Sequence, residues 1–184
     1  ESKLFAKPDA AVVLEKELRK PGYSPETLAI GTNTDPYQPI ERARRITREV
    51  LEVLSNFNHP TAIITKSQLI LRDLDILASM AERDLLSVGI SVTTLDQRLS
   101  RIMEPRAPTP KRRLETIRKL AEASIPVTVM LAPIIPAIND HEIEAIVAAA
   151  TESGAVAADY ILLRLPREVK ELFQEWLIAH YPGR

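Results

Sequence analysis

The sequence contains no cysteine among its 184 residues. This absence excludes disulfide bonds, thiolate metal sites and a cysteine nucleophile within the chain. Glycine is also scarce, with five residues, and neither a P-loop nor a dinucleotide-binding glycine fingerprint occurs. We therefore expect no backbone cradle for phosphate groups. The histidines are His59, His141 and His180, and their positions along the predicted elements do not favour a zinc site or a Ser–His pair.

The sequence also lacks a strong net charge and a long apolar run. Its 24 basic and 25 acidic residues give a net charge of −1, so bulk electrostatics offer no argument for nucleic-acid binding. No segment approaches the roughly 18 consecutive apolar residues of a membrane helix, and the first residues do not form a signal peptide. We expect a cytoplasmic protein with no membrane partner and one domain over residues 1–184.

Short apolar segments alternate with stretches of helical periodicity. The pattern predicts a helix over 9–20 and a long helix from Pro39 whose apolar stripe reaches Phe57. The predicted strands are residues 27–32, 62–65, 85–92, 126–131 and 160–163, each followed by a helix. These strands are continuous apolar runs, which is typical of a parallel sheet buried under helices. The periodicity predicts an α/β fold, either an incomplete barrel or a doubly wound sheet.

Polar residues gather where the predicted strands end. In parallel α/β folds, ligands bind at the carboxyl ends of the strands. The residues there are Thr32, Asn33, Thr34 and Asp35 after the first strand, Lys66 after the second, Ser91 and Thr93 at the third, Ile134 after the fourth, and Arg164 after the fifth. Charges of both signs suit a zwitterionic ligand. The alternative is that Asp35, Ser67 and Thr94 only cap helices.

Several strings carry a family resemblance. The segment 31–41, GTNTDPYQPIE, is distinctive, and so are TKS at 65–67, LRDLD at 71–75, EPR at 104–106 and LRLP at 163–166. In this order they resemble radical S-adenosylmethionine (SAM) proteins of the group related to spore photoproduct lyase, often called DNA repair photolyases. The resemblance covers essentially the whole chain. It implies an incomplete (β/α)6 TIM-like barrel, in which the five predicted strands are the second to sixth.

The same resemblance implies the cofactors. Members of the family bind SAM and a [4Fe–4S] cluster, and the cluster is held by three cysteines in a loop after the first strand. One electron cleaves SAM to a 5′-deoxyadenosyl radical, and an electron donor such as a reduced flavodoxin or ferredoxin is implied. The cysteine loop is not in this sequence, so we expect a partial radical SAM core that neither binds the cluster nor cleaves SAM alone. Nucleic acid is a candidate substrate by family analogy only.

The resemblance also assigns residues to parts of SAM. Thr32, Asn33, Thr34 and Asp35 occupy the segment that binds the amino group, and Asp35 is the best acceptor for an ammonium. Lys66 faces the carboxylate, with Arg106 as a second candidate. Ser91 and Thr93 match positions that contact the ribose, and Ile134 lies in the adenine segment. Tyr37 and Arg164 are assigned to the adenine or the substrate, and no residue is assigned as catalytic or as a metal ligand.

Two other functions fit the residues. The first is an α/β-barrel aldolase or lyase that uses Lys66 as a Schiff base. The second is a non-catalytic scaffold that has lost the cluster. Outside the strand ends, we expect Arg72 and Asp73 to form a helix-face ion pair. Phe173 and Trp176 are expected in the core, and the basic run 111–113 is expected to be a solvated helix start.

Overall fold

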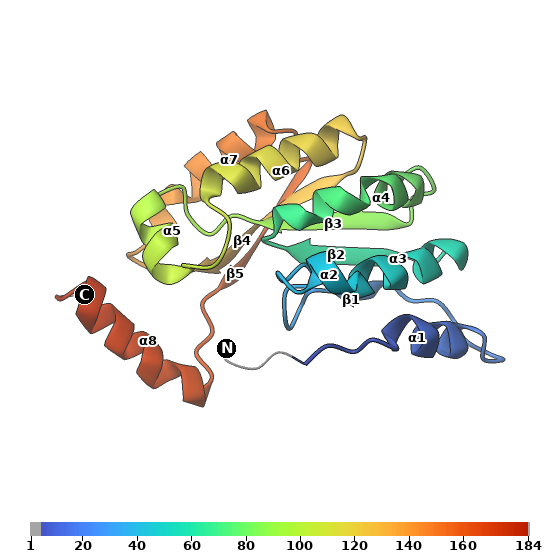
Figure 1. Ribbon diagram of the computed structural model, residues 1–184. Coiled ribbons are helices and arrows are strands. Elements are labelled where there is room, and N and C mark those ends of the chain that lie inside the picture. Colours follow the sequence, from blue (N-terminus) through green and yellow to red (C-terminus); the bar gives the residue numbers. More distant parts are fainter. Residues whose placement is uncertain (1–4, 184) are drawn as a thin grey trace.

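The computed structural model describes residues 5–183, which alternate between helices and strands (Figure 1). The strands are β1 (Leu28–Ile30), β2 (Thr61–Thr65), β3 (Leu86–Ser91), β4 (Val127–Ile134) and β5 (Ala157–Leu162). The α-helices are α1 (Ala10–Leu18), α2 (Glu41–Arg44), α3 (Ile46–Asn56), α4 (Leu74–Ala81), α5 (Gln97–Met103), α6 (Pro110–Glu122), α7 (Ile143–Glu152) and α8 (Arg167–His180). Two 3₁₀ helices, η1 (Gln68–Asp73) and η2 (Asp140–Glu142), complete the described chain. No helix among the described residues is long and apolar enough to cross a membrane.

The five strands form one sheet in the order β1-β2-β3-β4-β5, and every neighbouring pair is parallel. This confirms the predicted α/β fold with a parallel sheet. Strands that are consecutive in sequence are neighbours in the sheet, as they are in a (β/α) barrel. β1 and β5 do not pair with each other in the described chain, so the barrel is not closed.

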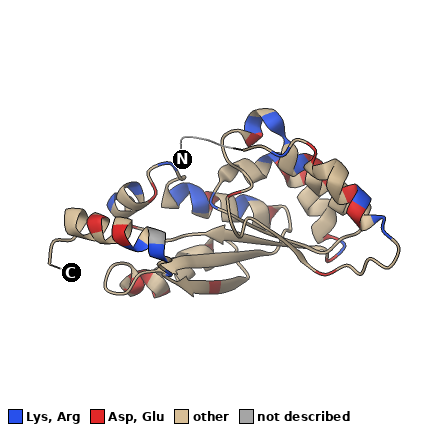
Figure 2. Ribbon diagram, turned by 90° about the horizontal axis from the view of Figure 1, so that it is seen from below, with Lys and Arg blue, Asp and Glu red and all other residues tan. Residues whose placement is uncertain are grey.

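One face of the sheet is covered by α3, α4, α6 and α7. Ile63, Val88 and Val129 point to this face and are almost completely buried. They share a single apolar cluster with side chains of the four helices, namely Leu51, Leu54, Leu77, Met80, Ile117, Leu120, Ile146 and Ala150. The charges lie mainly on the helices and loops, and the strands are almost free of them (Figure 2).

The opposite face of the sheet carries small and polar side chains. The strand register aligns Ile64, Gly89, Thr128 and Ala157 across this face, and Ser91, Met130 and Asp159 form the next row. A Cβ on Gly89 would lie 3.0 Å from the Met130 side chain. Ser87 of the same face is exposed. Parallel sheets are ordinarily covered on both faces, and in a barrel this second face lines the interior. The mostly small and polar side chains of this face are therefore more typical of a barrel interior than of a surface that packs against another helix.

Two predicted helices differ from the structure at their starts. The long helix expected from Pro39 is broken at Arg45, whose φ of 54° is left-handed, and this break separates α2 from α3. Ser67 was expected to cap an α-helix, but its Oγ accepts from the Leu69 N–H at the start of η1, and α4 begins only at Leu74. The predicted strands are still found, because the apolar stripe of each helical segment continues across the break at Arg45 and across η1.

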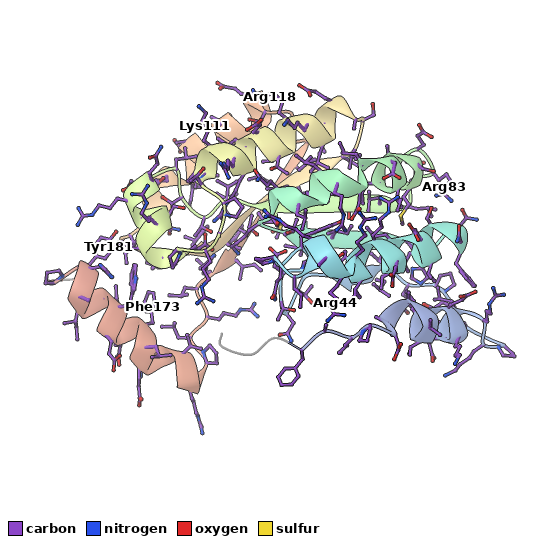
Figure 3. All side chains as sticks on the ribbon, in the orientation of Figure 1. Arg44, Arg83, Lys111, Arg118, Phe173 and Tyr181 are labelled. Atoms are coloured by element: carbon purple, nitrogen blue, oxygen red, sulfur yellow. The ribbon has the colours of Figure 1, made fainter. Side chains whose placement is uncertain are left out.

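The helix α8 packs apart from the main core, beside α5 (Figure 1). Phe173 and Tyr181 lie on the side of α8 that is turned to α5 (Figure 3), and they join Trp176 in a second apolar cluster. Phe173 and Trp176 are thus apolar packing residues as predicted, but they are partly buried in this smaller cluster and lie outside the main core. Val169 and Leu172 of the same helix are exposed, because α8 buries only a narrow stripe.

Candidate functional site

The loop after β1 is joined to the end of β2 by Asp35. Its Oδ1 accepts from the Tyr37 N–H (2.9 Å) and the Thr65 hydroxyl (2.7 Å), and its Oδ2 accepts from the Lys66 N–H (2.9 Å). The carboxylate thus holds the backbone of Lys66 at the carboxyl ends of the strands, which we call the carboxyl edge. Three of the roughly four acceptor positions of a carboxylate are filled from within the chain. Asp35 therefore anchors this edge, and its role as an acceptor for the SAM ammonium stays a prediction.

Asp35→Ala should lower the free energy of unfolding by about 1–3 kcal/mol, because it leaves three donors near the carboxyl edge without their acceptor. The change is measured by urea denaturation. Asp9→Ala is the matched control, since Asp9 precedes α1 without a side-chain cap hydrogen bond. Equal stability losses for the two variants would contradict the anchoring role.

The Lys66 side chain lies in a chain of three charges with Glu104 and Arg113. Lys66 Nζ is 3.5 Å from Glu104 Oε1, and Arg113 Nη2 is 2.6 Å from Glu104 Oε2. Thr93 Oγ1 also donates to Glu104 Oε2, at 3.3 Å. Because one carboxylate faces two cations, the group carries one positive charge in excess. Lys66 is the more exposed of the two cations, so this excess lies at the carboxyl edge.

Arg113 is almost completely buried, with 2% of its side chain exposed. Its Nε donates to the Pro108 carbonyl (2.8 Å) and its Nη1 to the Ser91 carbonyl (3.0 Å). A buried guanidinium requires a counter-charge and hydrogen-bond acceptors, and Glu104 together with the two carbonyls supplies them. Arg113 thus ties α6 to the end of β3. The expectation of a solvated helix start holds for Lys111 and Arg112, which are exposed, and is wrong for Arg113; Lys111 lies on the outer surface of α6 (Figure 3).

The loops after β3 and β4 are held together by Asn139. Its Nδ2 donates to the carbonyls of Thr93 (2.7 Å) and Pro133 (3.0 Å), and its Oδ1 accepts from the Ile135 N–H (2.6 Å). Glu142 adds a second link by accepting from the Thr94 hydroxyl and the Leu95 N–H, both at 2.6 Å. Thr94 had been expected to cap the next helix, but Asp96 caps it instead.

Most of the predicted polar residues are brought together at this edge. Hydrogen bonds and ion pairs connect Asp35 to Lys66, Lys66 to Glu104, and Glu104 to Thr93. Arg113 donates to the Ser91 carbonyl. Thr93 Oγ1 is also 3.3 Å from the Ala132 carbonyl oxygen, so its single proton is shared between this oxygen and Glu104 Oε2. Thr32, Asn33 and Thr34 follow β1 as an exposed segment beside this group.

Other predicted residues lie elsewhere. Tyr37 is buried in the main core, so its assignment to an adenine or a substrate is not supported by its position. Burial raises the pKa of the Tyr37 phenol, and the nearby Asp73 carboxylate raises it further. Ile134 is also a core residue. Arg106 and Arg164 are exposed and have no ion pair or hydrogen bond within the described chain, so the structure leaves them at the surface.

A second polar cluster lies on the helix side of the sheet. Arg72 donates to both oxygens of Asp73 (2.9 Å each) and to Glu41 Oε1 (3.0 Å). Arg48 donates to Asp73 and to Asp75, and its guanidinium lowers the pKa of Asp75 to about 2. The expected ion pair of Arg72 and Asp73 is confirmed, although Asp73 is completely buried. The cluster joins α2, α3 and η1, and it is a structural element of the fold.

The sequence signature of the Radical SAM superfamily matches residues 5–150. The chain belongs to the radical SAM superfamily. An uncharacterized protein of Mycobacterium tuberculosis, Rv2578c, is 32% identical over 99% of this radical SAM chain and 54% of its own length. A protein of Acidianus two-tailed virus, ORF301, is 39% identical over 102 residues, which are 55% of the chain and 33% of the viral protein. The chain spans about half the length of the curated relatives that it matches most fully.

Solved radical SAM structures share the fold. A spore photoproduct lyase with bound AdoMet and dinucleoside spore photoproduct superimposes with a TM-score of 0.70 at 15% identity, over 95% of this chain and 51% of the lyase. SuiB of Streptococcus suis, bound to S-adenosylmethionine, gives a TM-score of 0.57 at 15% identity, over 83% of this chain and 35% of SuiB. At these identities the likeness shows the fold, while the match over residues 5–150 confirms the predicted radical SAM resemblance.

Two residues of the site, Glu104 and Arg113, were missed as partners of Lys66 by sequence reasoning. A signal for Arg113 exists, because it lies four and seven residues before Ile117 and Leu120 and so falls on the buried stripe of α6. An arginine in such a stripe indicates a buried ion pair. Glu104 and Asn139 lie in loops, where periodicity gives no signal.

Proposed function

We propose that the carboxyl edge of this radical SAM chain binds SAM, and that Lys66 pairs with the SAM carboxylate. The observation that carries this proposal is the excess positive charge of the group formed by Lys66, Glu104 and Arg113. Glu104 is already neutralised by the buried Arg113, so the charge of Lys66 remains available to an anion. A charge-assisted hydrogen bond of this kind is worth about 1.5–3 kcal/mol.

The remaining parts of SAM are assigned by position. The exposed segment 32–34 is proposed for the amino group, because Asp35 is occupied by its internal hydrogen bonds. Ser91 and Thr93 are proposed for the ribose, and the segment around Ile134 for the adenine. Arg106 and Arg164 are proposed as outer contacts of SAM or the substrate. The polar side chains of Ser91 and Thr93 at the end of β3 support the ribose assignment, because hydroxyl groups can exchange hydrogen bonds with a ribose.

A [4Fe–4S] cluster does not fit the residues of this chain. The 184 residues include no cysteine to supply a thiolate, and no cluster of histidine and acidic residues that could hold a metal occurs within the described chain. In the complete protein, we propose that residues outside this sequence hold the cluster, and that a reduced flavodoxin or ferredoxin supplies the electron. The chain alone is proposed to be inactive.

The substrate is proposed by class only. A neighbour in fold binds a dinucleoside spore photoproduct, which makes a nucleic acid one candidate for the complete protein. The balanced net charge gives this candidate no electrostatic support. An anaerobic assay for iron content and SAM cleavage on the full-length protein tests the reaction class. Absence of SAM cleavage by a fully loaded protein would favour a scaffold instead.

Lys66→Ala should weaken SAM binding by about 10- to 150-fold, which corresponds to the loss of one charge-assisted hydrogen bond of about 1.5–3 kcal/mol. Binding is measured by isothermal titration calorimetry on the full-length protein. Lys119→Ala is the matched control, because Lys119 is an exposed lysine of α6 paired with Glu115. Unchanged affinity in Lys66→Ala would remove Lys66 from the site, and trapping of a carbonyl substrate on Lys66 by borohydride would indicate a Schiff base.

A further inference from the structure

We propose that Glu104 is an internal stand-in for the carboxylate of the ligand, holding Lys66 in the free protein and releasing it when SAM arrives. This inference rests on the proposed function of Lys66. It adds a regulation of that site, in which a carboxylate of the protein competes with a carboxylate of the ligand for one ammonium group.

The geometry shows which member of the pair is able to move. Lys66 and Glu104 are 3.5 Å apart, which is long for a charged hydrogen bond. Glu104 is held from its other oxygen by Arg113 at 2.6 Å and by Thr93 at 3.3 Å. The Lys66 side chain is 32% exposed, whereas that of Glu104 is 15% exposed. Lys66 is therefore the mobile partner, and Glu104 is the fixed one.

The charges show why the release of Lys66 from Glu104 costs little free energy. When an ammonium leaves a buried carboxylate, the carboxylate is ordinarily left without compensation. Here Glu104 retains the guanidinium of Arg113, with which it forms its shorter contact. Arg113 itself remains in place, because its other N–H groups donate to the carbonyls of Pro108 and Ser91. The ligand carboxylate thus replaces one partner of Lys66 without leaving a buried charge unpaired.

The arrangement also gives selectivity for a ligand with a carboxylate. A ligand without a carboxylate has no acceptor for the Lys66 ammonium, so the ion pair between Lys66 and Glu104 stays intact. Decarboxylated SAM is such a ligand and is otherwise the same nucleoside. Competition by Glu104 therefore affects the affinity for SAM and leaves the affinity for decarboxylated SAM unchanged.

The test is calorimetric titration of the full-length protein with SAM and with decarboxylated SAM. Glu104→Gln should raise the affinity for SAM by about two- to fivefold, the range expected from releasing a partly exposed ion pair. The affinity for decarboxylated SAM should stay the same. Glu115→Gln is the matched control, because Glu115 is a glutamate of the adjacent helix that pairs with Lys119. In a Lys66→Ala background, Glu104→Gln should have no effect on SAM binding.

Glu104→Asp covers the case in which Glu104→Gln does not fold. The shorter side chain keeps a negative charge for Arg113 and draws it away from Lys66, so SAM affinity should rise by a smaller factor. Unchanged or weaker SAM binding in the folded variant would overturn displacement by the ligand. An equal change for both ligands, or a change that persists in Lys66→Ala, would do the same. Loss of the Lys66→Ala effect itself is a different result, and it would overturn the proposed function as well.

Discussion

Arg113→Ala should lower the free energy of unfolding by about 3–5 kcal/mol, which is the typical loss when one partner of a buried ion pair is removed. The substitution leaves the Glu104 carboxylate without its principal counter-ion and the carbonyls of Ser91 and Pro108 without their donor. Urea denaturation followed by circular dichroism measures the change. A loss of this size is a large fraction of the stability of an ordinary domain.

Arg112→Ala is the matched control because Arg112 is the exposed neighbour of Arg113 on α6. Its effect should stay within about 0.5 kcal/mol, as for other surface substitutions. A similar small effect for Arg113→Ala would mean that Glu104 and the two carbonyls find other partners, and the buried ion pair would then not support the carboxyl edge.

Gly31→Ala should lower the free energy of unfolding by about 2–5 kcal/mol, from backbone strain and overlap together. Gly31 follows β1 with a φ of +95°, a conformation that L-residues rarely adopt. A Cβ there would lie 2.0 Å from the Ile64 carbonyl oxygen, which is a main-chain atom of the neighbouring strand. The loop with Asp35 would have to move, so urea denaturation should show the loss and SAM affinity should fall with it.

Gly22→Ala separates the two causes. Gly22 has a φ of +81°, but a Cβ there would meet no atom within 4 Å. This control should cost about 1–2 kcal/mol from the backbone strain alone. If Gly31→Ala cost no more than Gly22→Ala, the close approach of β1 to β2 would not constrain this position.

The sheet could be predicted because its strands are continuous apolar runs. Segments such as Ile63–Ile64 and Val88–Ile90 had to be buried, and regular helices between them leave only parallel pairing within one sheet. Strand ends shifted by a few residues, with β5 beginning at Ala157 rather than Tyr160. The pattern of apolar residues does not show at which residue a strand begins, because small residues such as Ala157 also form the backbone hydrogen bonds of the sheet.

The irregular elements could not be predicted because their causes are long-range. The left-handed Arg45 lies between two helices that share one apolar stripe. Two residues later, the Thr47 N–H donates to Glu41 Oε1 at 3.0 Å, which ties the start of α3 to α2. Sequence periodicity continues through such a break. The 3₁₀ start before α4 likewise follows from the buried pairing of Asp73 with Arg72 and Arg48.

The candidate site could be predicted in its location and only partly in its chemistry. Topology alone places Lys66, Ser91 and Thr93 at one edge, because parallel strands end on the same side. It does not show which polar side chains already have partners within the chain, so the hydrogen bond from the Lys66 N–H to Asp35 could not be predicted. Tyr37 was assigned from its place in a motif, while its side chain turns into the core.

The outer strand β5 has a further consequence for handling the chain in solution. Among the described residues it pairs only with β4, and Tyr160 and Leu162 are 63% and 56% exposed. A free strand edge with apolar flanks is a template for intermolecular β-sheet growth. Asp159 is the only charged residue in the five strands, and stacking identical chains along β5 would bring these carboxylates together. Asp159 is therefore placed where an acidic side chain disfavours pairing between copies of the chain along β5.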